Sequence, residues 1–438
     1  MTTLPRIGKQ SSKEVNLEDS LIGPEEAPND SNQADIRIPP NLVHTFVEAV
    51  QSRESVAGAT HNFYRYPGRF SPQFARTAIL IFTKPGDIVL DPFMGGGTTL
   101  VEARCVGRLA IGTDISSLAT FVARVKTTPL SEKDVSCLRR WSSTLCSKLN
   151  LHTPVKRPGK WIEKGYQRNI NSKNTWPIRK TLELALTHVD QLSAKRQRDF
   201  ARCALLNTAQ WALDCRTNVP SAKEFRARLL ECIEEMLEGS RGLSMLAPKA
   251  GLLCRPGKEL RTICLNRSAI GIETDPEVKS YSPPRLILTS PPYPGVHVLY
   301  SRWQIQGRKE TPAPFWIIGS PDGNGESFYS FGNRKQRHLK CYYDQLLGAF
   351  TSLARMSDHR TLLVQLVAFS DTSWQLKEYL KVMKNAGFSE MIFSQISNFS
   401  DGRLWRGVPN RKWYASKKGA LPSSKEVVLF HRLAKRLY

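Results

Sequence analysis

A glycine-rich motif, followed by an acidic residue further along the chain, could hold a nucleoside ligand. Residues 91–99 read Asp-Pro-Phe-Met-Gly-Gly-Gly-Thr-Thr and are predicted to join a strand to a helix at the carboxyl end of a sheet, where α/β folds bind ligands. Gly95 and Gly97 would let the backbone approach a ligand, and the first N–H groups of the helix could hold a carboxylate. Asp114, which ends the next predicted strand, is placed to bind two ribose hydroxyls.

The composition of this motif argues against two common nucleotide sites. Leu100 stands where a dinucleotide fingerprint has its third glycine, and the Gly-Lys-Ser/Thr of a phosphate loop is absent. The expected ligand is therefore a nucleoside with a small zwitterionic group, and S-adenosylmethionine fits that description. The alternative is an ordinary glycine-rich turn, which the flanking strand and helix and Asp114 make less favoured.

A second motif, Thr289-Ser-Pro-Pro-Tyr293, follows another predicted buried strand. Pro291 and Pro292 cannot continue a central strand, so the chain is expected to form a rigid, exposed loop. Ser290 and the Pro292 carbonyl could then accept hydrogen bonds from an amino group on a flat ring, and Tyr293 could stack on that ring. The alternative is a proline-rich turn that only ends a strand.

The elements that must position these motifs alternate between short apolar strands and helices. This pattern predicts an α/β fold, a Rossmann-like parallel sheet with helices on both faces. Strands are expected at residues 87–91, 109–114, 261–265, 285–290, 361–367, 390–395 and 426–431, and the apolar run 77–82 is also predicted to be a buried strand. Helices are expected at residues 98–105, 117–126 (capped by Ser116), 178–192, 195–215, 222–237 and 372–386.

The charge of the chain is strongly positive and uneven. There are 63 Lys and Arg against 39 Asp and Glu, a net charge of +24, which indicates a polyanionic partner and nucleic acid first. Residues 1–40 are acidic and are predicted to form a disordered tail. Residues 131–260 are predicted to be a helical insertion that binds DNA or recognises the target. The remaining segments, 41–130 and 261–438, are predicted to form one catalytic domain.

Two basic clusters also contain aromatic side chains, at residues 148–180 and 403–418. Basic side chains neutralise phosphates and aromatic rings stack on bases, so either cluster could contact nucleic acid, although a solvated surface is the alternative. Nine scattered cysteines, with no zinc spacing, argue against a metal site and favour reduced thiols in the cytoplasm. No apolar run is long enough to span a membrane, and no secretory signal is visible.

Together the two motifs resemble those of the S-adenosylmethionine-dependent DNA amino-methyltransferases. The Ser-Pro-Pro-Tyr form is similar to the cytosine-N4 branch, whereas the adenine-N6 branch more often has Asp or Asn at the place of Ser290. Residues 61–72 resemble the family's segment around the methionine end of the cofactor. The resemblance covers residues 60–130 and 261–438.

The resemblance implies a set of functional residues. The implied catalytic residues are Ser290, Pro291, Pro292 and Tyr293. The implied cofactor contacts are Tyr66, Pro67, Arg69, Phe70, Asp91, Pro92, Phe93, Gly95, Gly97, Thr98, Asp114 and Asn266. Asn266 departs from the family pattern, because it stands where an Asp usually contacts the adenine ring. Arg411 and Lys412, in a loop similar to one in some members, are candidates for phosphate contacts only.

The activity implied by this resemblance is methylation of the cytosine N4 amine at specific sites in double-stranded DNA. Such an enzyme would flip the target base out of the duplex. The resemblance also suggests a restriction-modification system with an endonuclease partner. Bases would be read from the insertion, from residues 295–345, or from both. The alternatives are adenine-N6 methylation, an RNA or tRNA amino-methyltransferase, and a non-catalytic DNA-binding protein. No Cys follows a Pro, which argues against carbon-5 methylation.

Overall fold

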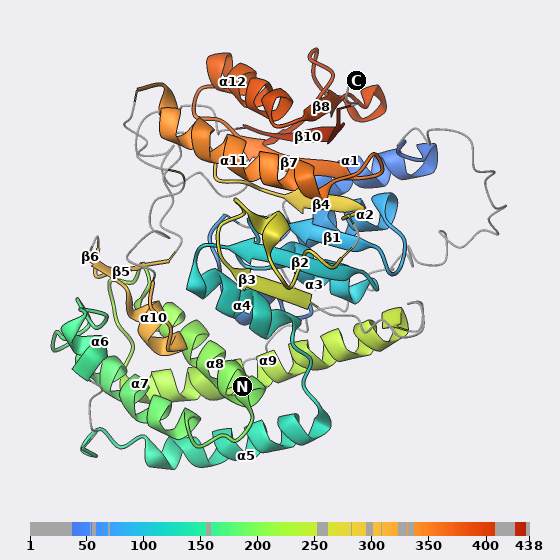
Figure 1. Ribbon diagram of the computed structural model, residues 1–438. Coiled ribbons are helices and arrows are strands. Elements are labelled where there is room, and N and C mark those ends of the chain that lie inside the picture. The colour runs from blue at the N-terminus through green and yellow to red at the C-terminus, as the bar shows by residue number, and fades with distance from the viewer. Residues whose placement is uncertain are drawn as a thin grey trace, which may run out of the picture. The chain divides into compact units, whose positions relative to one another are not determined.

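The computed structural model divides the chain into two units, residues 1–37 and 38–438, and all described elements lie in the second (Figure 1). The residues that the structure describes are 37–52, 54, 58–68, 71–154, 159–251, 262–281, 283–294, 301–307, 309–322, 331, 337–407 and 425–434. The predicted acidic tail therefore lies almost wholly outside the described residues, as do Arg69, Phe70, Arg411 and Lys412. Among the described helices, none has the length and apolar composition needed to cross a bilayer.

A mostly parallel sheet organises the second unit. Its strand order is β3-β2-β1-β4-β7-β10-β8, with β9 paired to β10. The first five strands are parallel to one another, and β10 is antiparallel to β7, β8 and β9. The strand bounds are β1 Ile88–Asp91, β2 Leu109–Asp114, β3 Thr262–Asn266, β4 Leu286–Thr289, β7 Leu362–Ala368, β8 Phe388–Met391, β9 Leu404–Gly407 and β10 Lys425–Leu433. A separate hairpin pairs β5 Trp303–Ile305 with β6 Lys309–Thr311.

Helices cover both faces of this sheet, which confirms the predicted fold class. One face packs against α11 and α12, with Phe350 and Tyr379 in the shared core. On the other face Phe430 of β10 contacts Phe46 of α1 and Phe82 of α2. The bounds are α1 Val43–Gln51, α2 Pro72–Phe82, α3 Thr98–Cys105, α4 Ser117–Thr127, α11 Lys340–Met356 and α12 Thr372–Asn385.

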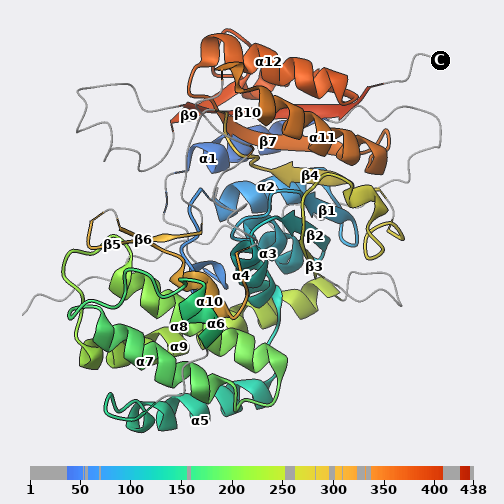
Figure 2. The same ribbon diagram turned by 60° about the vertical axis from the view of Figure 1, so that its left-hand side comes forward.

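The insertion between β2 and β3 is helical, but it is not a separate compact unit. Its helices are α5 Glu132–Lys148, α6 Gly159–Glu163, α7 Trp176–Val189, α8 Lys195–Leu213 and α9 Ala222–Gly251. Their apolar residues form one continuous core with α4, with α10 (Ala313–Ile318) and with Phe63, Tyr64 and Tyr66. Figures 1 and 2 show these helices gathered beside α4 and α10, away from α11 and α12. The insertion therefore shares its core with elements that flank the sheet.

Two strand predictions are wrong. The apolar run 77–82 is the second half of α2, because Ser71 caps a helix by accepting a hydrogen bond from the Gln73 N–H and Pro72 occupies the first turn. The strand expected at 390–395 ends at Met391, and Ser394–Ile396 form a 3₁₀ turn. Here the Phe393 ring packs on Phe430 at 4.7 Å between centroids instead of continuing the strand.

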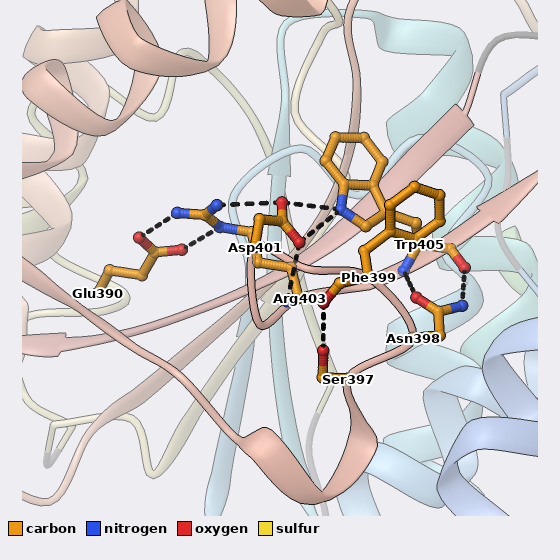
Figure 3. Close-up of polar contacts among 7 residues, drawn as sticks. All are labelled: Glu390, Ser397, Asn398, Phe399, Asp401, Arg403 and Trp405. Carbon is orange, nitrogen blue, oxygen red and sulfur yellow. Dashed lines mark hydrogen bonds and ion pairs between the residues drawn. The ribbon is translucent and has the colours of Figure 1, made fainter.

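The turn between β8 and β9 is held by its own side chains (Figure 3). The Asn398 side chain binds both backbone groups of Trp405, as a neighbouring strand would. Its Oδ1 accepts from the Trp405 N–H at 2.8 Å and its Nδ2 donates to the Trp405 carbonyl at 2.7 Å. The Trp405 indole N–H donates to Asp401 at 3.0 Å. Arg403 binds Glu390 of β8 through two hydrogen bonds of 2.7 and 2.8 Å. This turn fixes where β9 meets β10.

Asp91, at the end of β1, joins three elements through one buried carboxylate. Its Oδ1 accepts from the Phe93 N–H at 3.1 Å and from the Thr289 hydroxyl of β4 at 2.6 Å. Its Oδ2 accepts from the Thr99 hydroxyl of α3 at 2.7 Å. The ends of β1 and β4 and the first turn of α3 are thereby fixed to one another.

Replacing this carboxylate should destabilise the fold. We expect Asp91→Ala to lower the free energy of unfolding by about 3 kcal/mol, because it leaves buried donors without their acceptor. Urea denaturation measures the change. The matched control is Asp87→Ala, which removes one acceptor in a turn, for the Lys84 N–H, and should cost about 1 kcal/mol. Equal losses in the two variants would contradict the special role of Asp91.

Candidate active site

The glycine loop between β1 and α3 is packed so closely that side chains would not fit. A Cβ on Gly97 would lie 2.8 Å from the Ala123 Cβ of α4, and one on Gly96 would lie 2.8 Å from the Tyr66 Cβ. Gly97 also has a φ of +77°, which favours glycine. The loop is held by the Met94 N–H, which donates to the Thr113 carbonyl of β2 at 3.1 Å. The loop is thus held tightly by Tyr66, by α4 and by β2, and its role in holding the cofactor stays a prediction.

The segment 61–66 lies directly against this loop, as the predicted cofactor role requires. The Tyr66 ring is 3.2 Å from the position that a Cβ on Gly95 would take. His61 is buried and its Nε2 lies 2.6 Å from Glu102 Oε1 of α3, while Arg76 of α2 binds the other oxygen of Glu102 at 2.7 Å. Pro67 is half-buried at the end of this segment. The upstream segment is therefore anchored to the helix that follows the glycine loop.

Asp114, at the end of β2, is bonded to the glycine loop. Its Oδ2 accepts from the Gly95 N–H at 3.0 Å, and its Oδ1 accepts from the Ser116 N–H at 2.8 Å. Burial raises the pKa of Asp114 to about 6, against these two hydrogen bonds, which favour the ionised form. Each carboxylate oxygen keeps a further lone pair, so the side chain can also accept from ribose hydroxyls. Burial likewise raises the pKa of Asp91 to about 6.

The other predicted cofactor residues have different surroundings. Pro92 and Thr98 are buried, while Phe93 is half-buried with its ring 5.6 Å from that of Phe331. The Asn266 side-chain amide donates to the carbonyls of Asp114 and Ile115 at 3.1 and 3.0 Å. Asn266 thus holds the loop that follows β2, and its contact with an adenine ring stays a prediction.

The predicted catalytic loop follows β4 and lies beside the glycine motif. Thr289, whose hydroxyl binds Asp91, immediately precedes Ser290. The Ser290 hydroxyl lies 3.1 Å from the Tyr293 hydroxyl, and the Pro292 carbonyl accepts from the Tyr342 hydroxyl of α11 at 2.7 Å. The two motifs, distant in the sequence, are therefore brought to neighbouring strand ends, with Pro291 buried between them and the rest of the loop partly exposed.

Glu426 of β10 is a part of this loop's surroundings that the sequence analysis missed. The Tyr293 hydroxyl donates to Glu426 Oε1 at 2.8 Å. The pKa of Tyr293 is raised well above its usual value, first by burial and then by the Glu426 carboxylate, so this hydroxyl keeps its proton. Arg406 of β9 binds the other oxygen of Glu426 at 2.7 Å. One sequence signal was available: Glu426 is the only acidic residue in 403–438.

The described part of the 403–418 cluster is engaged inside the fold, whereas the 148–180 cluster has both buried and exposed members. Arg403 and Arg406 are engaged with glutamates, and Trp405 is 7% exposed. Tyr166 is buried and its hydroxyl donates to Asp322 at 3.0 Å, while Trp176 is 38% exposed. Of the aromatic residues expected to stack on bases, Trp176 is thus accessible and Tyr166 and Trp405 are not. Trp413 and Tyr414 lie outside the described residues.

Comparison with known proteins gives a family match for the segment that contains the glycine loop. Residues 13–120 match the family model described as DNA methylase, of the N6 and N4 type. This match is confined to residues 13–120, and it does not separate the cytosine-N4 from the adenine-N6 branch. The matched residues include the glycine loop and Asp114. They also extend into the acidic segment 1–40, whereas the resemblance described above begins at residue 60. The family implies S-adenosylmethionine as the methyl donor.

The relatives are similar over short segments. The chain is 39% identical over 80 residues to the Type II methyltransferase M.MjaII of Methanocaldococcus jannaschii, and 40% identical over 80 residues to the Type II methyltransferase M.MvaI of Kocuria varians. Both matches cover 18% of this chain, but 14% and 18% of the relatives. A tRNA (guanine(10)-N2)-dimethyltransferase of M. jannaschii is 49% identical over 53 residues, 12% of this chain and 15% of that protein. The chain therefore matches less than a fifth of each relative's length.

The close packing of Gly97 generates one prediction. We expect Gly97→Ala to weaken S-adenosylmethionine binding at least tenfold and to cost about 3 kcal/mol of stability, because the new Cβ meets α4 at a positive φ. Isothermal titration calorimetry and thermal unfolding measure both. Gly86→Ala is the control, since Gly86 has a φ of +85° but open space around it, and it should cost about 1 kcal/mol without affecting binding. Unchanged cofactor affinity in Gly97→Ala would contradict the prediction that the glycine loop holds the cofactor.

The raised pKa of Asp114 predicts a pH dependence of cofactor binding. Because the ionised carboxylate accepts from ribose hydroxyls, the affinity should rise as the pH rises through about 6 and fall roughly tenfold at one unit below that value. Titration calorimetry between pH 5 and pH 7.5 tests this. Asp114→Asn should bind more weakly at pH 7.5 and lose the pH dependence. If Asp114→Asn keeps the pH dependence of the wild type, the titrating group is Asp91 instead.

Proposed function

We propose that this protein transfers a methyl group from S-adenosylmethionine to the exocyclic N4 amine of cytosine in double-stranded DNA. The observation that carries the proposal is the hydrogen-bond direction in the catalytic loop. The Tyr293 hydroxyl donates its one proton to Glu426 Oε1, so its oxygen must accept from Ser290. Ser290 has then used its one proton, and its oxygen presents lone pairs. A group that presents N–H donors, such as an amine, is the complementary substrate.

The mechanism follows from the acceptors that this loop offers. The Pro292 carbonyl has a second lone pair beside the one used by Tyr342, so it and Ser290 Oγ can each accept one amine hydrogen. Two acceptors on the amine favour a pyramidal nitrogen, whose lone pair is no longer conjugated with the ring. That lone pair can then attack the sulfonium methyl from about 3 Å. The Tyr293 ring would stack on the flipped base and offset part of the flipping cost.

The choice of cytosine over adenine rests on Ser290. The resemblance places Ser in the cytosine-N4 branch, whereas Asp or Asn is more common at this position in adenine-N6 enzymes. The same hydrogen bonds would hold an adenine amine, so adenine-N6 methylation remains the second candidate. The tRNA guanine-N2 relative methylates another ring amine, which keeps an RNA substrate as a third. A non-catalytic DNA-binding protein is opposed by the complete pair of motifs.

The helical insertion is proposed to bind the DNA backbone. Residues 131–265 carry a net charge of +12, and basic side chains neutralise phosphates. Exposed basic residues on its described part include Lys133, Arg140, Lys148, Lys164, Arg168 and Lys173. A modification role in a restriction-modification system, with an endonuclease partner in the cytoplasm, is proposed from the same resemblance and the Type II relatives.

The decisive substitution is Ser290→Ala. It removes one of two amine acceptors, so we expect the single-turnover rate of methyl transfer to fall by about 10² with little change in cofactor affinity. Mass spectrometry of nucleosides from methylated DNA should show N4-methylcytosine with the wild type. The control is Ser397→Ala, whose hydroxyl only donates to the Phe399 carbonyl in the turn of Figure 3. Accumulation of N6-methyladenine would overturn the choice of base, and cofactor binding without any transfer would overturn the activity.

A further inference from the structure

A continuous chain of hydrogen bonds leads away from the proposed amine site into the sheet. It begins at the Ser290 hydroxyl, passes to the Tyr293 hydroxyl over 3.1 Å, and ends at Glu426 Oε1 over 2.8 Å. All donors in the chain point the same way, toward the carboxylate. Ser290 is thus the only group of the three that faces the proposed substrate with a lone pair.

The glutamate at the end of this chain is held in one orientation. Arg406 contacts Glu426 Oε2 through Nε at 2.7 Å and through Nη2 at 2.6 Å, so Oε1 is left to Tyr293. Arg406 is itself fixed by a 2.9 Å hydrogen bond to the Val50 carbonyl of α1. The pairing of β9 with β10 places Arg406 directly opposite Glu426, and both residues are buried. Such a fixed Glu426 carboxylate either stabilises the fold or takes part in the chemistry of the loop that carries Ser290 and Tyr293.

We propose that Glu426 takes up, through Tyr293 and Ser290, the proton that the amine releases on methylation. The proposal rests on the amino-methyl transfer of the preceding section, though not on the identity of the base. As the nitrogen forms its bond to the methyl carbon, the sulfonium becomes a neutral thioether and the nitrogen becomes an ammonium. The ammonium gives one proton to Ser290 Oγ, Ser290 gives its own proton to Tyr293 Oη, and Tyr293 gives its proton to Glu426 Oε1. Both hydroxyls are restored and Glu426 ends as a neutral acid.

The chemistry makes this direction favourable. The methylated ammonium on the ring is a strong acid, because losing a proton lets the nitrogen lone pair conjugate with the ring again, so even a carboxylate paired with Arg406 can accept that proton. Before the transfer, the negative end of the chain polarises the two hydroxyls and makes Ser290 a better acceptor, since hydrogen bonds in a chain strengthen one another. Positive charge develops on the nitrogen in the transition state, and the chain stabilises it there. The proton returns to water after the product leaves.

Two substitutions interrupt the chain at different places. Tyr293→Phe keeps the ring for stacking and removes the relaying hydroxyl, and Glu426→Gln keeps the shape and removes the acceptor. Each should lower the single-turnover rate of methyl transfer by about 10², the lower end of what general acid–base catalysis contributes. The KM for DNA and the cofactor affinity should change little. Because the two groups act in one chain, the double variant should be no slower than the slower single variant.

The control is Glu390→Gln, which breaks another Arg–Glu pair of the same sheet, that with Arg403 (Figure 3), whose members have no hydrogen bond to the chain of hydrogen bonds described above. It should reduce the thermal midpoint about as much as Glu426→Gln and leave the rate unchanged. If Tyr293→Phe and Glu426→Gln transfer methyl groups at the wild-type rate, or if their effects multiply in the double variant, the relay is wrong. If the wild type transfers no methyl group to DNA, the proposed function itself is wrong, and the relay with it. The two failures can therefore be told apart: the wild type tests the function, and the variants test the relay.

Discussion

The hydrogen bonds to Asp91 are the interaction on which the rest of the site depends. One buried carboxylate accepts from the backbone of the glycine loop, from the first turn of α3 and from the end of β4. Burying that charge is costly, as its raised pKa shows, and the three hydrogen bonds offset part of the cost. Since Ser290 follows Thr289 directly, the Asp91 side chain fixes how the Ser290 loop lies relative to the glycine loop.

Local signals in the sequence were sufficient to predict the elements around the glycine loop. The apolar strands β1 and β2, the glycines between them and the Ser116 cap of α4 are each encoded within a few residues, and the structure has them where they were expected. The apolar run at 77–82 misled because its helix-start signal, Ser71-Pro72, lies before the run. Glu426 could not be linked to Tyr293 in this way, because the two are 133 residues apart and meet only through the strand order of the folded sheet.

The net charge of the chain does not show which of its basic residues are free at the surface. In the described part of the 403–418 cluster, the two arginines face glutamates of neighbouring strands. Those glutamates, Glu390 and Glu426, lie outside residues 403–418, so the charges of the two described arginines are neutralised by residues from other parts of the chain. Some cations of the insertion, such as Lys195 and Arg196, are likewise paired with acidic residues of their own segment. Others, such as Lys164 and Arg168, are exposed, and the insertion that carries them shares a core with α4.

The position of β10 has a consequence for how the protein is made. It follows all other strands of the sheet in the chain, yet it lies inside the sheet, and among the described strands β8 and β9 pair only with it. During translation the parallel half, from β3 to β7, can assemble first, whereas the antiparallel half must wait for this last strand. A growing chain would therefore complete the glycine loop well before the Glu426 carboxylate that faces Tyr293 is made, so the proposed cofactor site would form before the proposed methyl-transfer site.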